Sequence, residues 1–225
     1  MQQNLFSKSE SHSKPDAIGD TQVTYKQASS LLNKSSGFMA AYDYTLNPYS
    51  GCFFGCTYCY AAFFSRSKEK MDNWGHWVEV KENALELLRK KRKNSINGKK
   101  IYMSSVTDPY QPIEKKLELT RSILEVLLLH QPRLVIQTRS PLITRDIDLL
   151  KQFDHIQVNM TVTTDSEEVR KVFEPQCPKN STRLAAIKEV KANGIQSVIT
   201  MTPLLPVLDT HAFIRQLKDT CVDSY

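Results

Sequence analysis

The sequence predicts an α/β fold built on a parallel sheet, and two observations carry that prediction. Strand-like and helix-like segments alternate along most of the 225 residues, and such alternation is typical of parallel strands joined by helices that pack outside the sheet. Hydrophobic residues make up 40% of the chain and charged residues 24%. This is an ordinary composition for a protein with one sizeable core.

The first half of the chain supplies an arm, two strands and two helices. Residues 1–36 are rich in Ser, Lys, Gln and Asn with little periodicity, so we expect a flexible polar N-terminal arm. Residues 41–49 alternate apolar and polar side chains, which predicts the first strand, and residues 101–106 are expected to form the second. Apolar stripes predict helices over residues 78–93 and 113–129.

The second half continues the alternation. Pro132 lies just beyond the helix expected at 113–129, and Gly194 ends the helix expected at 183–193. Further strands are expected at 134–138, 156–161 and 197–201, and further helices at 146–153, 183–193 and 210–221.

Residues 47–64 combine more chemistry than any other stretch. Gly51 and Gly55 allow the backbone to turn tightly, and seven aromatic residues between 49 and 64 would give the loop a dry, apolar wall. Thiolates are soft ligands that suit iron–sulfur clusters, and a 4Fe–4S cluster normally takes four cysteines. Three local cysteines would leave one iron open to a substrate or cofactor. These cysteines, spaced C-x₃-C-x₂-C, are Cys52, Cys56 and Cys59.

Three other readings of these cysteines were weighed. A structural zinc site needs four ligands, and the candidates for the fourth (His76, Cys177 and Cys221) are distant in sequence and unpaired. Disulfides fit poorly, because five cysteines leave one over and no secretory signal is visible. A cluster that only carries electrons would need a fourth cysteine at short spacing.

The cysteine motif, with Tyr58 just before the third cysteine, resembles the signature of the radical S-adenosylmethionine (SAM) enzymes. The wider string Asn-Pro-Tyr-Ser-Gly-Cys and the following Tyr-Cys-Tyr-Ala resemble the spore photoproduct lyase-like branch of that family. The resemblance extends over most of the chain from about residue 22. It continues in Thr-Asp-Pro-Tyr-Gln-Pro (107–112), Ser-Pro-Leu-Ile-x-Arg-Asp (140–146), Glu-Pro (174–175) and Arg-Leu (183–184).

This resemblance implies a partial (β/α) barrel of the radical SAM type, with about six β/α units. Only about five strands are expected before the chain stops at Tyr225, so we expect a barrel shortened at its C-terminus. The expected organisation is therefore the flexible arm, 1–36, followed by the radical SAM core, 37–225.

Polar residues follow each expected strand, and ligands in parallel β/α folds bind at those carboxyl ends. Arg139 is the most specific of them, because a guanidinium can hold the carboxylate of SAM with two hydrogen bonds. Arg183 could do the same or lie on a helix surface, and Asp108 could contact SAM or cap the turn before Pro109. Thr161 stands where similar proteins tend to have Ser near the SAM ribose. The full set expected to bind SAM is Tyr58, Thr107, Asp108, Arg139, Thr161 and Arg183.

The activity that the resemblance implies is reductive cleavage of SAM. A reduced 4Fe–4S cluster passes one electron to the sulfonium, and the resulting 5′-deoxyadenosyl radical abstracts hydrogen from a substrate that the sequence does not identify. Electron supply implies a flavodoxin- or ferredoxin-like partner. The absence of a membrane-span-like run or signal core, together with the need for free thiols, predicts a cytoplasmic enzyme.

Two other functions stay open at this point. The chain could be a non-catalytic protein that binds a cluster or SAM as a sensor, an electron carrier or a truncated relative. It could also be a DNA photoproduct repair lyase, since a net charge of +6 permits nucleic-acid binding without requiring it. True lyases use a cysteine near the end of the second strand as hydrogen donor. Here that region reads Tyr-Met-Ser-Ser-Val-Thr-Asp, and only Tyr102 or Tyr110 could take its place.

Overall fold

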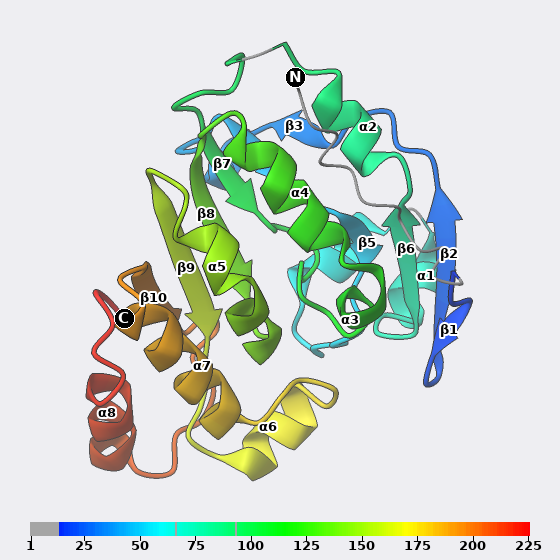
Figure 1. Cartoon of the computed structure of the whole chain (residues 1–225). Coiled ribbons are helices and arrows are strands. Elements are labelled where there is room, and N and C mark those ends of the chain that lie inside the picture. The colour runs from blue at the N-terminus through cyan, green and yellow to red at the C-terminus, as the bar shows by residue number, and fades with distance from the viewer. Residues whose placement is uncertain (1–13, 66, 93) are drawn as a thin grey trace.

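The computed structural model describes residues 14–65, 67–92 and 94–225. Within these ranges ten strands form two sheets, and a single large cluster of buried apolar side chains spans both of them (Figure 1). The α/β class predicted from the sequence is confirmed. No helix in the described ranges is both long and apolar enough to cross a membrane.

The larger sheet has the strand order β10-β9-β8-β7-β4-β3 over the described residues. All neighbouring pairs from β4 to β10 are parallel, and β3 is antiparallel to β4. Because successive parallel strands are neighbours, the sheet winds in one direction, as the wall of a (β/α) barrel does. The six strands are β3 (Leu32–Lys34), β4 (Tyr44–Leu46), β7 (Lys100–Met103), β8 (Arg133–Thr138), β9 (Ile156–Thr161) and β10 (Gln196–Thr200).

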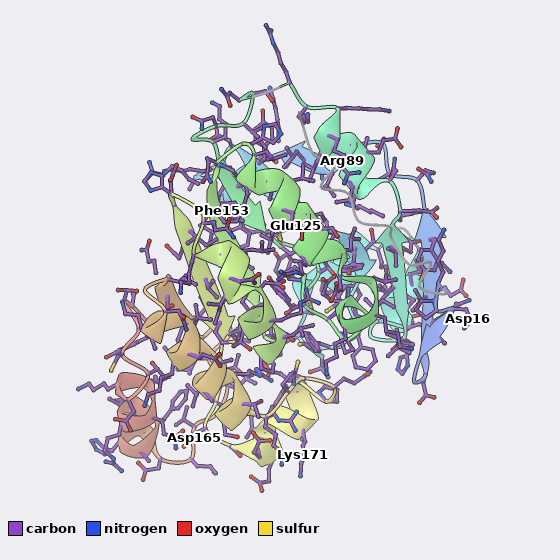
Figure 2. The ribbon with its side chains drawn as sticks, in the orientation of Figure 1. Asp16, Arg89, Glu125, Phe153, Asp165 and Lys171 are labelled. Carbon is purple, nitrogen blue, oxygen red and sulfur yellow. The ribbon has the colours of Figure 1, made fainter. Side chains whose placement is uncertain are left out.

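The barrel is open in the part of the chain that the structure describes, because the edge strands β3 and β10 do not pair with each other. Figure 1 shows α4, α5 and α7 on one face of the larger sheet, and side chains fill the space between these helices and the strands (Figure 2). Ile123, Leu124 and Leu127 are the buried stripe of α4. This arrangement leaves the carboxyl ends of the strands as one shared edge.

The helices vary widely in length, from the four residues of the shortest to the thirteen of α7. The α-helices are α1 (Lys68–Asp72), α2 (Ala84–Arg89), α3 (Glu114–Leu117), α4 (Leu119–Leu128), α5 (Ile147–Leu150), α6 (Glu167–Phe173), α7 (Asn180–Ala192) and α8 (Thr210–Lys218). Short 3₁₀ helices occupy Gly37–Met39, Tyr60–Phe64 and Pro141–Asp146.

The smaller sheet lies beside the larger one and has the order β1-β2-β6-β5. Strand β5 pairs antiparallel with β6 and ends at Gly51, immediately before Cys52. The smaller sheet therefore fixes the start of the cysteine loop. Its strands are β1 (Ala17–Ile18), β2 (Thr21–Lys26), β5 (Tyr49–Gly51) and β6 (Trp77–Lys81).

Three predictions for the first ninety residues differ from the structure. Residues 14–36 of the expected arm contain β1, β2 and β3, because β2 pairs with β6 and buries Val23; residues 1–13 lie outside the described ranges. The strand expected at 41–49 is divided between the two sheets, since Pro48 has no N–H for a continuous ladder. The helix expected at 78–93 begins with strand β6, whose alternating burial follows a period of two.

The later elements match the prediction in type, with shifted ends. The long helix expected at 113–129 is broken at Glu118, which has φ 48°, and its two parts are α3 and α4. The Glu114 carboxylate accepts the N–H of Thr120 at 2.9 Å and so caps α4. Helix α6 was not predicted.

Candidate active site

The cysteine loop is anchored to two distant parts of the chain. The Thr107 hydroxyl donates to the Gly51 carbonyl at 2.5 Å, and the Phe53 N–H donates to the Gln111 side chain at 2.8 Å. On the other side, the Thr57 N–H donates to the Phe173 carbonyl at 2.9 Å. These bonds give a short irregular loop a defined shape, because its backbone groups are satisfied by the surrounding protein.

Two glycines let the loop approach its neighbours closely. Gly51 has φ +75°, and a Cβ there would lie 2.4 Å from the carbonyl oxygen of Trp77 and 2.6 Å from its ring. Gly55 has φ +54°, and a Cβ there would lie 3.1 Å from the Cα of Gly75. Glycine is required at Gly51 for both conformation and space.

The three cysteines line one cavity of about 680 Å³. Cys52 and Cys56 are buried, at 9% and 5% exposed, and Cys59 is half-buried. Phe54 and Trp74 line the same wall, so the apolar lining that the sequence predicts is present. All five cysteines lie in the described ranges and are free thiols.

The donor set suits a cluster better than a single metal ion. Among the described residues, no three His, Cys, Asp or Glu side chains converge closely enough to hold one ion. A cubane cluster does not need such convergence, because each thiolate binds a separate iron at a separate corner. Three thiols along the wall of a cavity, at the spacing C-x₃-C-x₂-C, therefore fit an iron–sulfur cluster, which Cys52, Cys56 and Cys59 would hold through three of its irons.

The thiols differ in their readiness to lose a proton. Burial raises the pKa of Cys52 and of Cys59. The hydrogen bond with Cys177 lowers the pKa of Cys56, and Arg139 and Arg183 act in the same direction against the effect of burial. Cys56 is therefore the thiol most favourably placed to become a thiolate, which is the form that binds metal.

The cavity opens at the carboxyl ends of strands β7 to β10. Of the six residues that the sequence predicts to bind SAM, five line it: Tyr58, Thr107, Asp108, Arg139 and Thr161. Asn159, Gln137 and Thr200 line it as well, and their side chains belong to the strand ends where polar residues were expected. A polar floor and an apolar wall with thiols thus meet in one space.

Hydrogen bonds show what Asp108 and Thr161 already do. The buried carboxylate of Asp108 accepts from the N–H groups of Tyr110 and Arg139 and from the Thr138 hydroxyl, at 2.7–2.8 Å. Asp108 therefore holds the turn and the start of the Arg139 loop. The Thr161 hydroxyl accepts from Gln137 at 2.6 Å, within a network that reaches across three strands.

Arg139 joins the cysteine loop to the strand ends. Its Nη2 donates to the Tyr58 hydroxyl at 3.0 Å, and its Nε lies 3.6 Å from the Glu174 carboxylate. The Tyr58 hydroxyl donates in turn to Glu174 at 2.5 Å. With 20% of its side chain exposed, the guanidinium is held in place and still borders the cavity.

Arg183 has a different position from the one expected. Its side chain is completely buried, and it does not line the cavity. Its Nη2 lies 2.6 Å from the equally buried Glu174 carboxylate. Its Nε donates to the Pro178 carbonyl at 2.9 Å and its Nη1 to the Thr161 carbonyl at 3.2 Å. Arg183 therefore supports the back of the site.

Two residues of the site were not chosen from the sequence. Glu174 stands between Arg139 and Arg183 and also accepts from Thr163 at 2.9 Å. Cys177 lies 3.6 Å from Cys56, measured between the two sulfurs. The Glu-Pro string at 174–175 was part of the family resemblance and could have indicated Glu174, whereas a single cysteine carries no such signal.

The two tyrosines considered as hydrogen donors are separated by the structure. Tyr102 lines the cavity, donates to the Gln137 side chain at 2.9 Å and packs edge-to-face on Tyr42, with ring centroids 4.9 Å apart. Burial raises its pKa, so it keeps its proton. Tyr110 is fully buried and does not line the cavity.

A second hollow, of about 650 Å³, lies at the opposite edge of the same sheet. It is lined by the first residues of the strands, among them Lys100, Arg133, Ile156 and Gln196. Because the carboxyl ends of parallel strands gather the loops that bind ligands, and because the cysteines lie there, the cavity beside the cysteines is the candidate active site.

The fold and this cysteine loop define the class of protein. The chain belongs to the Radical SAM superfamily, which it matches over residues 46–217. The resemblance stated from the sequence is thereby confirmed, and membership of this superfamily indicates an enzyme.

The chain is also similar to individual proteins of known sequence. The chain is 40% identical over 176 residues to an uncharacterized protein of Methanocaldococcus jannaschii, and this alignment covers 78% of the chain and 66% of the relative. It is 26% identical over 171 residues to the radical SAM Nalpha-GlyT isomerase of Pseudomonas phage M6, covering 76% of the chain and 35% of that protein.

Among solved structures, the fold is similar to spore photoproduct lyase. A mutant of that enzyme with bound AdoMet and dinucleoside spore photoproduct matches with a TM-score of 0.63 and 16% identity, covering 88% of the chain and 56% of the lyase. The chain thus spans about half the length of these structures, and at this identity the similarity concerns the fold.

Proposed function

We propose that the protein is a radical SAM enzyme that binds a 4Fe–4S cluster through Cys52, Cys56 and Cys59 and SAM in the adjoining cavity. The observation that carries the proposal is the meeting of three thiols and the Arg139 guanidinium in one cavity at the carboxyl ends of the strands. When bound and reduced, the cluster supplies one electron that cleaves SAM to methionine and a 5′-deoxyadenosyl radical.

The chain's own residues would bind and orient SAM. Arg139, held by Tyr58 and Glu174, is positioned to pair with the carboxylate of the methionine moiety. Thr161 and Thr107 line the same cavity and would offer hydroxyls to the SAM ribose. The aromatic wall excludes water from the reacting atoms, which protects reactive species from side reactions.

The substrate would enter through the mouth of the cavity. Phe38, Tyr42 and Tyr60 line the cavity, and Phe38 and Tyr60 are 75% and 44% exposed. Tyr102 is the candidate hydrogen donor within the cavity. A flavodoxin- or ferredoxin-like protein is the proposed reductant, and a reducing compartment such as the cytoplasm would keep the thiols free.

Reductive SAM cleavage tests this proposal. The protein is reconstituted anaerobically with iron and sulfide, mixed with dithionite and SAM, and assayed for 5′-deoxyadenosine and methionine by mass spectrometry. We expect both products, and neither from Cys52→Ala, Cys56→Ala or Cys59→Ala, each of which should lose its iron. The exposed thiol of Cys221 provides the matched control, since Cys221→Ala should keep both iron and products.

The same assay also tests two alternative functions, DNA photoproduct repair and a non-catalytic role. Structural neighbours bind a dinucleoside spore photoproduct, so a DNA lesion is one candidate substrate; against it, no cysteine other than the three of the loop lines the described cavity. Consumption of a dinucleoside photoproduct together with SAM would favour repair. A stable cluster that never yields 5′-deoxyadenosine, even with candidate substrates present, would favour a non-catalytic role.

A further inference from the structure

A fourth thiol lies directly behind the cysteine loop. The sulfurs of Cys177 and Cys56 are 3.6 Å apart, and the two residues are 6% and 5% exposed. Cys56 lines the cavity, whereas Cys177 is not among the described residues that do so. Cys177 therefore contacts the ligand residue from the side that does not border the cavity.

The backbone holds Cys177 firmly in this position. The buried guanidinium of Arg170 donates to the carbonyls of Cys177 and Glu174 at 2.8 Å and 3.0 Å, and the Cys177 N–H donates to the Glu174 carbonyl at 3.0 Å. The same segment accepts the Thr57 N–H of the cysteine loop through Phe173. Backbone hydrogen bonds therefore hold both the Cys177 segment and the cysteine loop in the positions that bring the two sulfurs together.

We propose that Cys177 is a positioning residue for the cluster, donating an S–H hydrogen bond to the sulfur with which Cys56 binds iron. This inference rests on the proposed function. A thiol can donate weakly to sulfur, and hydrogen bonds to the ligating sulfurs are among the factors that set the reduction potential of a cluster. Reduction adds negative charge that spreads onto those sulfurs. A donor at Cys56 therefore stabilises the reduced cluster more than the oxidised one and raises the potential.

The direction of donation follows from the surroundings. A thiolate that binds iron has no proton left to give, so Cys56 can only accept. Cys177 does not line the described cavity, so it would bind no iron of the cluster and would keep its S–H. In the pair, Cys177 is the donor and Cys56 the acceptor.

Redox titration of the reconstituted protein tests the inference without using activity. Wild type, Cys177→Ala, Cys177→Ser and the control Cys221→Ala are loaded with iron and sulfide, and the reduced fraction of the cluster is followed by electron paramagnetic resonance. At the wild-type midpoint potential, we expect Cys177→Ala to show a reduced-to-oxidised ratio about threefold lower, as befits the loss of one weak hydrogen bond. Cys177→Ser retains an O–H donor and should lie close to wild type.

Each other outcome overturns a different statement. If wild type takes up no cluster, the proposed function fails and the inference fails with it. If the cluster forms and Cys177→Ala matches wild type, the hydrogen bond is refuted while the proposed function stands. If Cys177→Ser falls as far as Cys177→Ala, packing and not donation accounts for the effect. Loss of iron from Cys177→Ala but not from Cys221→Ala would make Cys177 a ligand and refute its role as a donor.

Discussion

The substitution Glu174→Gln should destabilise the protein far more than its small change in shape suggests. The Glu174 carboxylate is completely buried, 2.6 Å from the completely buried guanidinium of Arg183 and 3.6 Å from Arg139. Glutamine keeps an acceptor for Tyr58 and Thr163 but removes the charge, which leaves two guanidinium groups close together without compensation. Breaking a buried ion pair by removing one partner costs about 3–5 kcal/mol.

The measurement is the free energy of unfolding of the metal-free protein, from urea denaturation followed by circular dichroism. Thermal denaturation gives a second readout: for a chain of this size each kcal/mol shifts Tm by about 2–4 °C, so we expect Tm to fall by about 6–20 °C. Glu125→Gln is the matched control, because Glu125 is an exposed residue of α4 (Figure 2), and it should change the free energy of unfolding by less than about 0.5 kcal/mol.

A double-mutant cycle with Arg183→Met decides whether charge is the cause. If Glu174 mainly balances Arg183, removing both charges should cost less than the sum of the single changes, with a coupling of about 1–3 kcal/mol. Additive losses, or a loss below about 1 kcal/mol for Glu174→Gln alone, would refute the interpretation of this pair as the electrostatic support of the site.

Three further predictions concern acid stability, the cysteine loop and SAM. Burial raises the pKa of Glu174 but its arginine partners outweigh burial, so the pKa is lowered from 4.5. The carboxylate therefore stabilises the fold above pH 4.5, and that stabilisation is lost as the pH falls through the lowered pKa. In an acid titration, the free energy of unfolding should fall more steeply for wild type than for Glu174→Gln. Gly51→Ala should cost about 1–3 kcal/mol more than Gly98→Ala in urea denaturation, because both glycines have positive φ but only the first meets a neighbour; equal losses would remove the steric argument. Arg139→Met should weaken SAM binding to the reconstituted protein about ten- to a hundredfold by calorimetry, whereas Arg133→Met, at the other end of β8, should not change it.

The larger sheet could be predicted because its strands carry strong local signals. Residues 134–138 and 156–161 are short runs rich in Val, Ile and Thr, and the strands found there keep the predicted positions within one residue. The smaller sheet could not be predicted in this way. Strand β6 is only five residues long and precedes a helix, so its period of two was absorbed into the helical stripe of residues 78–93. Its assignment depends on pairing with β2, more than fifty residues earlier.

The residues of the candidate site differ in the same way, because some carry a local signal in the sequence and others do not. Cys52, Cys56 and Cys59 could be chosen from the sequence because their spacing is local, and Arg139 because it directly follows a strand. Glu174 carries no such local signal and was marked only by the Glu-Pro string of the resemblance, since it follows a short helix and its partners lie on other elements. Side-chain direction was also beyond the sequence: Arg183 carries the same charge as Arg139 yet is turned into the protein core.

The sum of charges behind the cysteine loop explains why these distant residues belong together. Arg139 and Arg183 bring two positive charges, and Glu174 brings one negative charge between them, so one positive charge remains beside Cys56. The hydrogen bond with Cys177 and, after it, that remaining positive charge favour a thiolate at Cys56, in a buried position where burial alone would oppose it. Without Glu174 the two guanidinium groups would repel each other in the interior. Without both arginines, the negative charge of Glu174 would oppose the thiolate of Cys56. The segment from Glu174 to Arg183 is therefore as much a part of the candidate cluster site as the cysteine loop, and substitutions there should alter the cluster without touching any of its ligands.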